Sequence, residues 1–205
     1  MKKIIVSFLF ALVTFSCFAQ DEPEEKDNKD RGFKKENLFT GGTLNLSFSN
    51  YGSVLGASPQ LGYSVANWLD AGIIMGFTYS SQRDIYDTKY RQTLITPGAF
   101  ARLFPFDFLF ASVQYEHNFI NQKQLFPSGG GSYREHFDVN SLLVGVGYSG
   151  GKEGRNSPYY YFSISVDVLQ NKNSPYTDQY NNLLPVINAG FNIPLFQGSS
   201  RRRYD

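Results

Sequence analysis

Apolar and polar residues alternate with a period of two along much of this chain. Residues 41–50, "GGTLNLSFSN", place leucine and phenylalanine on one parity and threonine, asparagine and serine on the other. The same alternation recurs around Ile73 and Ile164. Because a β-strand points successive side chains to opposite faces, this pattern predicts strands with one apolar and one polar face. The chain is therefore expected to be all-β.

The alternating segments predict eight strands, at residues 38–49, 54–66, 68–81, 90–104, 108–120, 137–149, 158–169 and 184–196. Each segment is longer than the roughly five or six residues typical of strands in soluble proteins. Their lengths suit the roughly 9–11 residues that a tilted strand needs to cross a bilayer. We therefore predict an eight-stranded antiparallel up-and-down transmembrane β-barrel over residues 38–196.

The connections between these segments alternate in length. Asn67 and residues 105–107 form short turns, whereas residues 82–89, 121–136 and 170–183 are long and polar. A membrane barrel has tight periplasmic turns and longer outer loops, so three mobile outer loops and periplasmic termini are expected. Two connections depart from this pattern, because 50–53 is short and 150–157 is long.

The composition of the polar parity indicates which face of each strand meets solvent. It consists mostly of glycine, serine, threonine and asparagine, with almost no lysine. Small residues suit the crowded interior of an eight-stranded barrel, whereas the wet face of a soluble sandwich carries Lys and Glu. We therefore expect Leu44, Ile73 and Ile164 to point outward, toward lipid. A soluble secreted barrel that holds a small apolar ligand is the alternative.

Two prolines, Pro59 and Pro97, fall in the middle of predicted strands, where each removes one hydrogen bond of the ladder. We expect local β-bulges at both positions. Pro185 and Pro194 lie near strand ends, where they disturb the pairing less.

Aromatic residues make up 17% of the chain and gather near the predicted strand ends. An amphipathic ring gains stability at the level of the lipid headgroups, so these positions predict interfacial girdles. Ordinary packing within hairpins is the alternative explanation. The residues expected in the girdles are Trp68, Phe104, Phe106, Phe108, Tyr159 and Tyr160.

The N-terminal sequence "MKKIIVSFLFALVTFSCFAQ" predicts a secretory signal peptide over residues 1–19. An uncleaved membrane anchor and lipidation of Cys17 are alternatives, although the residues before Cys17 differ from the usual lipoprotein signal. Residues 20–37 are expected to form a disordered, charged periplasmic leader, and residues 197–205 a basic C-terminal tail.

Cleavage after Ala19 would remove the single cysteine and two of the 19 basic residues, leaving 17 against 18 acidic ones. The exported chain would then have no disulfide, and its charge balance does not indicate a nucleic-acid partner.

The chain resembles the small eight-stranded outer-membrane β-barrel family, of the porin-like superfamily, over residues 38–196. The similarity rests on "FTGGTLNLSFS", "SPQLGYSVANWLDAGIIMGFTY", "PGAFARLFPF", "LFASVQYEHNF" and "NSLLVGVGYS". The segment "NAGFNIPLF" resembles the terminal assembly signal of such barrels, with Asn188, Gly190, Ile193, Leu195 and Phe196. A tail follows Phe196 here, whereas many members end at the aromatic residue. The resemblance implies an outer-membrane location and recognition by the assembly machinery, but no particular activity.

Charged residues inside the predicted strands are the candidates for function. Antiparallel pairing places Asp70 opposite or diagonal to Arg102, both toward the lumen. A desolvated pair of this kind is costly unless the two groups satisfy each other, and it could serve as a plug or as the gate of a narrow pore. Glu116 and Asp167 are expected to line the upper lumen, where they favour cations or bind polar neighbours.

The sequence predicts no catalytic, metal or cofactor site. His117 and His136 are far apart, and neither has a nearby serine on its own face to act as a nucleophile. The segment "SGGGS" is read as a flexible loop, because no strand-loop-helix pattern surrounds it.

We therefore expect an outer-membrane protein with a structural or surface-interaction role. Its expected partners are lipid and lipopolysaccharide, together with an unknown external partner that meets its outer loops. A narrow gated pore and a lipid-modifying enzyme are the alternatives.

Overall fold

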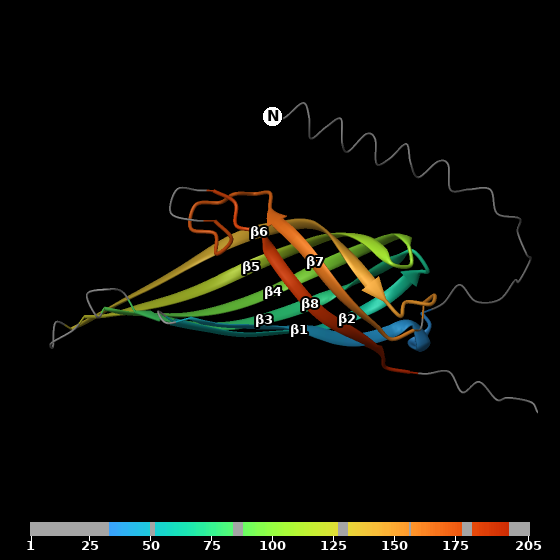
Figure 1. Ribbon diagram of the computed structural model, residues 1–205, viewed down its shortest axis with the longest axis horizontal. Coiled ribbons are helices and arrows are strands. Elements are labelled where there is room, and N and C mark those ends of the chain that lie inside the picture. Colours follow the sequence, from blue (N-terminus) through green and yellow to red (C-terminus); the bar gives the residue numbers. More distant parts are fainter. Residues whose placement is uncertain are drawn as a thin grey trace, which may run out of the picture. The chain divides into compact units, whose positions relative to one another are not determined.

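The computed structural model describes residues 33–49, 52–83, 88–126, 131–155, 157–177 and 182–196 (Figure 1). The chain divides into two units, residues 1–33 and 34–205, and the second contains all the described secondary structure. The predicted signal peptide, most of the predicted leader and the predicted tail lie outside the described residues. No helix among the described residues is long and apolar enough to span a membrane.

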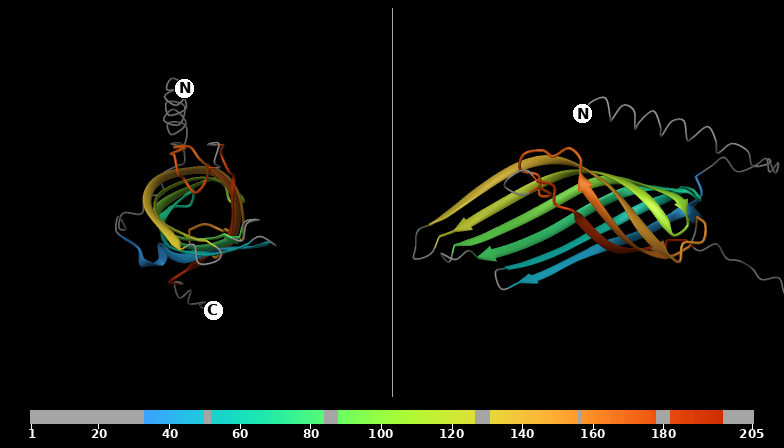
Figure 2. Two further views of the ribbon diagram at one scale, coloured as in Figure 1. Left: turned by 90° about the vertical axis from the view of Figure 1, so that its left-hand side faces the viewer. Right: turned by 45° about the horizontal axis from the view of Figure 1, so that its top comes forward.

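The second unit is a single antiparallel sheet of eight strands in up-and-down order, which confirms the predicted all-β class and strand number. Strand β1 also pairs with β8, so the sheet closes into a barrel, as the end-on view in Figure 2 shows. The strands are β1 (Leu38–Ser49), β2 (Gly52–Ala66), β3 (Leu69–Arg83), β4 (Lys89–Phe106), β5 (Leu109–Leu125), β6 (Ser132–Gly150), β7 (Tyr159–Asp167) and β8 (Val186–Pro194).

The predicted outer loop 121–136 is wrong, because most of it is strand. Strands β5 and β6 pair without interruption as far as Leu125 opposite Ser132. The connection predicted at 82–89 is likewise shorter, since β3 continues to Arg83 and β4 begins at Lys89. Of the three predicted loops, only 170–183 stays a long connection, and an isolated bridge joins Thr177 to Leu183.

The apolar parity points away from the barrel axis, as expected. Leu44, Ile73 and Ile164 are 66%, 61% and 48% exposed, whereas the polar parity is buried inside. Buried polar side chains include those of Thr43, Gln60, Ser64, Thr96, Asn118, Ser141, Ser165 and Asn192. The barrel is therefore polar within and apolar over much of its outer surface.

The wall of the barrel is much taller on one side than on the other. Strands β4, β5 and β6 have 18, 17 and 19 residues, whereas β7 and β8 have nine each. The β6–β7 pairing ends at Leu143 opposite Asp167, so residues 132–142 of β6 extend beyond the end of β7. Strand β1 pairs with β8 only over Phe39–Thr43. The hairpins of β2 to β6 project past β7 and β8 in Figures 1 and 2.

The bulges predicted at Pro59 and Pro97 are absent. Pro59 pairs in register with Gly42 and Pro97 with Met75, and the register is the same on both sides of each proline. Each proline interrupts the pairing with only one neighbouring strand, which matches the loss of a single N–H group. The two register shifts lie instead near turns, between Ser64 and Ala66 and between Leu103 and Phe106.

The end of the predicted disordered leader is ordered. Residues Lys35–Asn37 form a 3-10 helix, and Asn37 is buried. The Lys34 backbone N–H donates a hydrogen bond of 3.1 Å to the hydroxyl of Tyr63 on β2. The prediction of disorder is therefore wrong for these residues, because β2 supplies a polar partner for the chain that enters β1.

Candidate functional site: a charged floor and a polar cavity in the lumen

The pairing of β3 with β4 places Asp70 directly opposite Arg102, which is one of the two arrangements that the sequence predicts. Both side chains are buried in the lumen, near the turns that join β2 to β3 and β4 to β5. The structure shows no direct ion pair between them: the Tyr159 hydroxyl bridges the two, since it accepts a hydrogen bond of 3.5 Å from Arg102 Nη1 and donates one to Asp70. Each is held by groups that the sequence analysis did not bring together.

Asp70 forms an ion pair with Lys152, whose Nζ lies 3.2 Å from Asp70 Oδ2. The side chain of Asp70 is 0% exposed and that of Lys152 is 1% exposed. The Tyr159 hydroxyl donates a second hydrogen bond of 2.8 Å to the same oxygen. Asp70 Oδ1 is the one buried side-chain polar atom in the described part of the chain without a hydrogen-bond partner. The carboxylate is therefore compensated on one side only.

Arg102 is held by an amide and by aromatic rings rather than by a carboxylate. Its Nη2 donates a hydrogen bond of 2.9 Å to Gln60 Oε1 on β2. Its guanidinium carbon lies 4.2 Å from the ring centre of Tyr161 and 4.6 Å from that of Phe100. Such cation–π contacts stabilise a cation that has lost its water. Gln60 in turn contacts the buried amide of Asn192 on β8, which ties Arg102 to the seam that closes the barrel.

Aromatic side chains pack around these charges and fill this end of the lumen. The Phe104 ring lies 5.3 Å from that of Phe110 and 5.8 Å from that of Tyr159. Lys152 Nζ sits 4.3 Å from the centre of the Phe104 ring. We call the charged floor the set Gln60, Asp70, Phe100, Arg102, Phe104, Phe110, Lys152, Tyr159, Tyr161 and Asn192.

Two of the predicted interfacial aromatics therefore point inward. Phe104 and Tyr159 are buried in the charged floor, and their assignment to an outer girdle is wrong. Regular alternation explains both cases, because Phe104 shares the parity of the buried Arg102 and Tyr159 shares that of the buried Asp167. The four other predicted girdle residues are exposed: Trp68, Phe106, Phe108 and Tyr160.

Lys152 is the floor residue that sequence reasoning missed most clearly. It lies in the connection between β6 and β7, outside any strand, so its parity gives no information about its direction. One signal in the sequence could have pointed to it, namely the unexpected length of the connection 150–157. The extra residues let this segment fold back so that Lys152 reaches a carboxylate 82 positions away in sequence.

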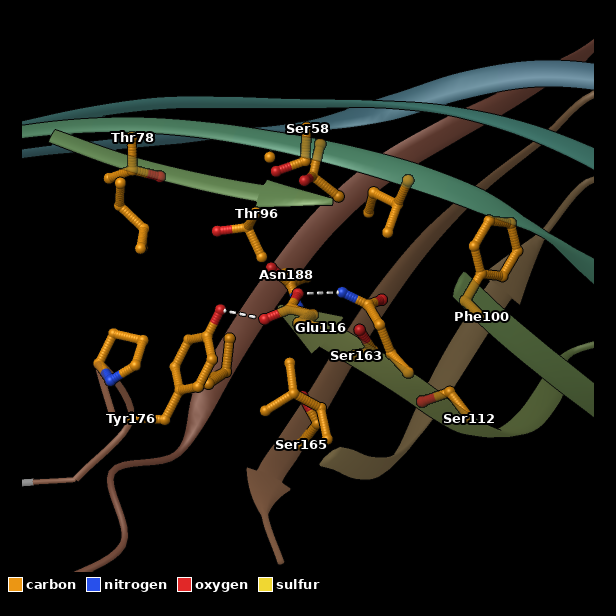
Figure 3. Close-up of a pocket in the computed structure, with 18 of the residues that line it drawn as sticks. Ser58, Thr78, Thr96, Phe100, Ser112, Glu116, Ser163, Ser165, Tyr176 and Asn188 are labelled. Atoms are coloured by element: carbon orange, nitrogen blue, oxygen red, sulfur yellow. Dashed lines mark hydrogen bonds between the residues drawn. The ribbon is translucent and has the colours of Figure 1, made fainter. Parts of the chain in front are cut away.

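Beyond the charged floor, the lumen contains a cavity of about 370 Å³ (Figure 3). Hydroxyl groups are frequent along its walls, including those of Ser58, Thr96, Ser112, Ser163 and Ser165. Glu116 on β5 points into this space from the wall, as predicted. It is buried without an ion pair to any described residue, and it accepts hydrogen bonds of 2.5 Å from Gln114 and 2.6 Å from Tyr176.

Tyr176 reaches Glu116 from the long connection between β7 and β8, so this connection closes one side of the cavity. Burial, followed by the negative charge of Glu116, raises the pKa of the Tyr176 phenol well above its usual value. The phenol therefore stays neutral near pH 7 and acts as the donor in this hydrogen bond. Pro175 lines the cavity beside it.

Asp167 faces inward on β7, on the parity of Ser165, but it is not among the residues that line the cavity. It is fully buried at the end of β7, where it organises the start of the same connection. Its Oδ1 accepts hydrogen bonds from the backbone N–H groups of Leu142 and Leu169, and its Oδ2 accepts one of 2.7 Å from the Ser174 hydroxyl. Asp167 therefore fixes the segment that carries Tyr176.

Neither histidine lies beside a nucleophilic side chain in the described part of the chain. His117 lies on the outer face of β5 and contacts Asn140, with 2.6 Å between Nδ1 and Oδ1. Ser141 lies on the inner face of β6 and is fully buried beside Asn118. His136 is exposed on β6. The described residues contain no group of three or more His, Cys, Asp or Glu side chains that could hold a metal ion.

The predicted terminal assembly signal lies on β8 and just after it. Asn188 and Gly190 face the lumen, where an added Cβ at Gly190 would lie 2.6 Å from the Tyr161 ring. The other three residues, Ile193, Leu195 and Phe196, are exposed. Strand β8 ends at Pro194, and the Leu195 backbone N–H still donates to the carbonyl of Leu38.

Comparison with known proteins does not assign the chain to a family. No protein-family model matches it, and no curated protein matches it either.

Proposed function

We propose that this chain is an integral outer-membrane β-barrel with a structural or surface-interaction role. The observation that carries this proposal is the reversal of the usual arrangement of side chains. Large apolar residues cover the outside of the barrel, while Ser, Thr, Asn, Gln and charged groups fill the inside. An exterior of this kind is costly in water and favourable in lipid.

The height of the apolar surface supports the same proposal. On β5, exposed apolar side chains run from Leu109 to Phe119, which is roughly 34 Å at about 3.4 Å per residue. With the roughly 40° tilt of barrel strands, this stretch rises roughly 26 Å along the barrel axis. The lipid-facing band of outer-membrane barrels is about 25 Å tall. The belt therefore matches the thickness of a membrane.

The tall side of the barrel supports a role in surface interaction. Within the described residues, positions 132–139 of β6 have no strand paired along their outer edge. Near the base of this edge, Asn140 accepts a hydrogen bond of 2.6 Å from Asn171. Free backbone N–H and C=O groups can pair with an extended segment of another chain. This edge is where we place the contact with an external partner.

A narrow pore is the second candidate, because a polar cavity lies in line with the charged floor. The floor argues against free conduction, since aromatic rings and the Asp70–Lys152 pair occupy the lumen there. Planar-bilayer recordings of the wild type and Arg102→Ala separate the two candidates. Absence of current in both proteins would exclude the pore, and current in the variant alone would identify the floor as a gate.

We propose no catalytic role, because His117 and Ser141 lie on opposite faces of the sheet. Mass spectra of outer-membrane lipids with and without the gene test a lipid-modifying activity. Unchanged spectra would support the absence of that activity.

An arginine on the apolar belt tests the proposed location most directly. Ile73→Arg places a charge near the middle of the belt, and we expect it to destabilise the inserted barrel by about 2–4 kcal/mol. The matched control is Tyr79→Arg, on the same face of β3 but nearer the rim, with an expected cost of about 0–1 kcal/mol. The measurement is the fraction of chain that inserts into vesicles and migrates as the compact form on an unheated gel.

Two outcomes would contradict the membrane proposal. Equal insertion of Ile73→Arg and Tyr79→Arg would show that the belt does not face lipid. Recovery of the wild-type protein in detergent-free buffer after cell lysis would favour the soluble barrel instead.

A further inference from the structure

Three basic side chains line up across three neighbouring strands on the tall side of the barrel. Arg91 on β4 is paired with Lys123 on β5, and Lys123 is paired with Arg134 on β6. Neighbouring strands lie about 4.8 Å apart, and side chains directly opposite each other have Cβ atoms about 5 Å apart. We call Arg91, Lys123 and Arg134 the basic row.

The basic row lies on the outer face of the sheet, directly above the apolar belt. Arg91 shares the parity of Ile95, and Lys123 shares that of Phe119, with no register shift between them. Both apolar residues are exposed on the belt. Four residues along a strand correspond to roughly 13 Å, or roughly 10 Å along the axis of a tilted barrel. The row therefore sits close to headgroup depth, since the polar zone extends about 5–8 Å beyond the hydrocarbon core.

The charges of the basic row are not balanced by described neighbours. None of its three residues forms an ion pair within the described part of the chain. Glu135 is adjacent to Arg134 in sequence but points to the other face, and Asp138, on the same face, is roughly 13 Å away along β6. The row above adds another basic pair, Arg83 opposite Lys89.

Like charges directly opposite each other destabilise a sheet. An arrangement of three aligned cations is therefore costly unless an anion binds among them. Arginine can hold phosphate oxygens with two parallel hydrogen bonds, and lysine adds a mobile point charge. A phosphate group in the plane of the headgroups would contact all three side chains at once.

We infer that the basic row binds the phosphate groups of a phosphorylated glycolipid in the leaflet through which this rim emerges. This inference rests on the proposed membrane location. The partner is a lipid with a phosphorylated sugar headgroup, and its site lies on the outer face of β4 to β6.

Native mass spectrometry of the folded mature chain in neutral detergent tests this inference, with bisphosphorylated and dephosphorylated lipid A as probes. The variant R91Q/K123Q/R134Q should bind the bisphosphorylated lipid about 100-fold more weakly than the wild type. The control K35Q/R155Q/K172Q removes the same number of charges outside the row, and its affinity should stay within about twofold. Dephosphorylated lipid A should bind weakly to all three proteins.

The compact form on unheated gels, measured in vesicles for each protein, keeps the two proposals distinguishable. Failure of the wild type to insert would overturn the proposed function and the lipid site with it. Insertion together with equal lipid binding by the row variant and the control would overturn the lipid site alone.

Two further measurements complete the test. Wild-type binding of inorganic pyrophosphate as tight as that of the lipid would overturn the assignment to a lipid. If the triple variant does not insert, the single variants R91Q, K123Q and R134Q replace it, each with an expected loss of about fivefold. Unchanged binding in all three single variants would then overturn the site.

Discussion

Buried charges are compensated differently at the two ends of the lumen. In the charged floor, Asp70 contacts Lys152 directly, and Arg102 is held by Gln60 and aromatic rings. In the cavity, Glu116 forms no ion pair with any described residue and depends on hydrogen bonds from Gln114 and Tyr176. The floor is packed with rings, whereas the cavity is lined with hydroxyl groups and holds open space.

This difference shows which part of the lumen seals the barrel. A buried ion pair surrounded by rings tolerates the loss of neither partner, because the remaining charge cannot reach water. A carboxylate in a polar cavity that accepts hydrogen bonds from neutral donors can lose its charge with little loss of stability. We therefore expect substitutions in the floor to affect stability more strongly than substitutions around the cavity.

Lys152→Ala should have the largest effect in this comparison. It leaves Asp70 buried without its cation, and we expect it to lower the free energy of unfolding by about 3–5 kcal/mol. Urea unfolding in detergent, followed by the fluorescence of Trp68, the single tryptophan, measures this change. The control is Glu153→Ala, an exposed neighbour in the same connection, with an expected change within about 0.5 kcal/mol. Equal effects of the two variants would contradict a sealing role for the ion pair.

Alanine in place of glycine compares the packing of the two regions. At Gly147 in the floor, an added Cβ would lie 2.3 Å from the Phe110 ring, and we expect a loss of about 1–3 kcal/mol. At Gly76 beside the cavity, the nearest atom is Thr96 Cβ at 3.1 Å, so the expected change is within about 0.5 kcal/mol. The same urea titration applies to both variants. A loss at Gly76 as large as that at Gly147 would show that the cavity is packed as tightly as the floor.

Glu116→Gln should have a small effect. The amide oxygen can still accept the hydrogen bond from Tyr176, and removal of a buried charge offsets the loss of a charged acceptor. We expect the free energy of unfolding to stay within about 1 kcal/mol of the wild type. If the free energy of unfolding instead fell as much as expected for Lys152→Ala, the carboxylate would have an essential cationic partner. The cavity would then compensate its buried charge in the same way as the floor.

Much of the fold could be predicted from the chain because the alternation of side chains in a strand is a local property. The period of two places Leu44, Ile73 and Ile164 on one face without any knowledge of distant contacts. Closing the connection 82–89 as a hairpin then places Asp70 opposite or diagonal to Arg102, and the structure shows the opposite arrangement. The prediction of a loop at 121–136 failed because this hairpin meets water on both faces. A strand in that position needs no alternation of apolar and polar residues, so the sequence pattern does not reveal it.

The sequence by itself therefore determined the eight strands and the alternation of faces along them. Only the tertiary structure decided that Lys152 folds back onto Asp70 between the rings of Phe104 and Tyr159, and that Tyr176 reaches Glu116. The physical reason is that residues in connections have no fixed parity. Their directions depend on which partners the closed sheet brings within reach.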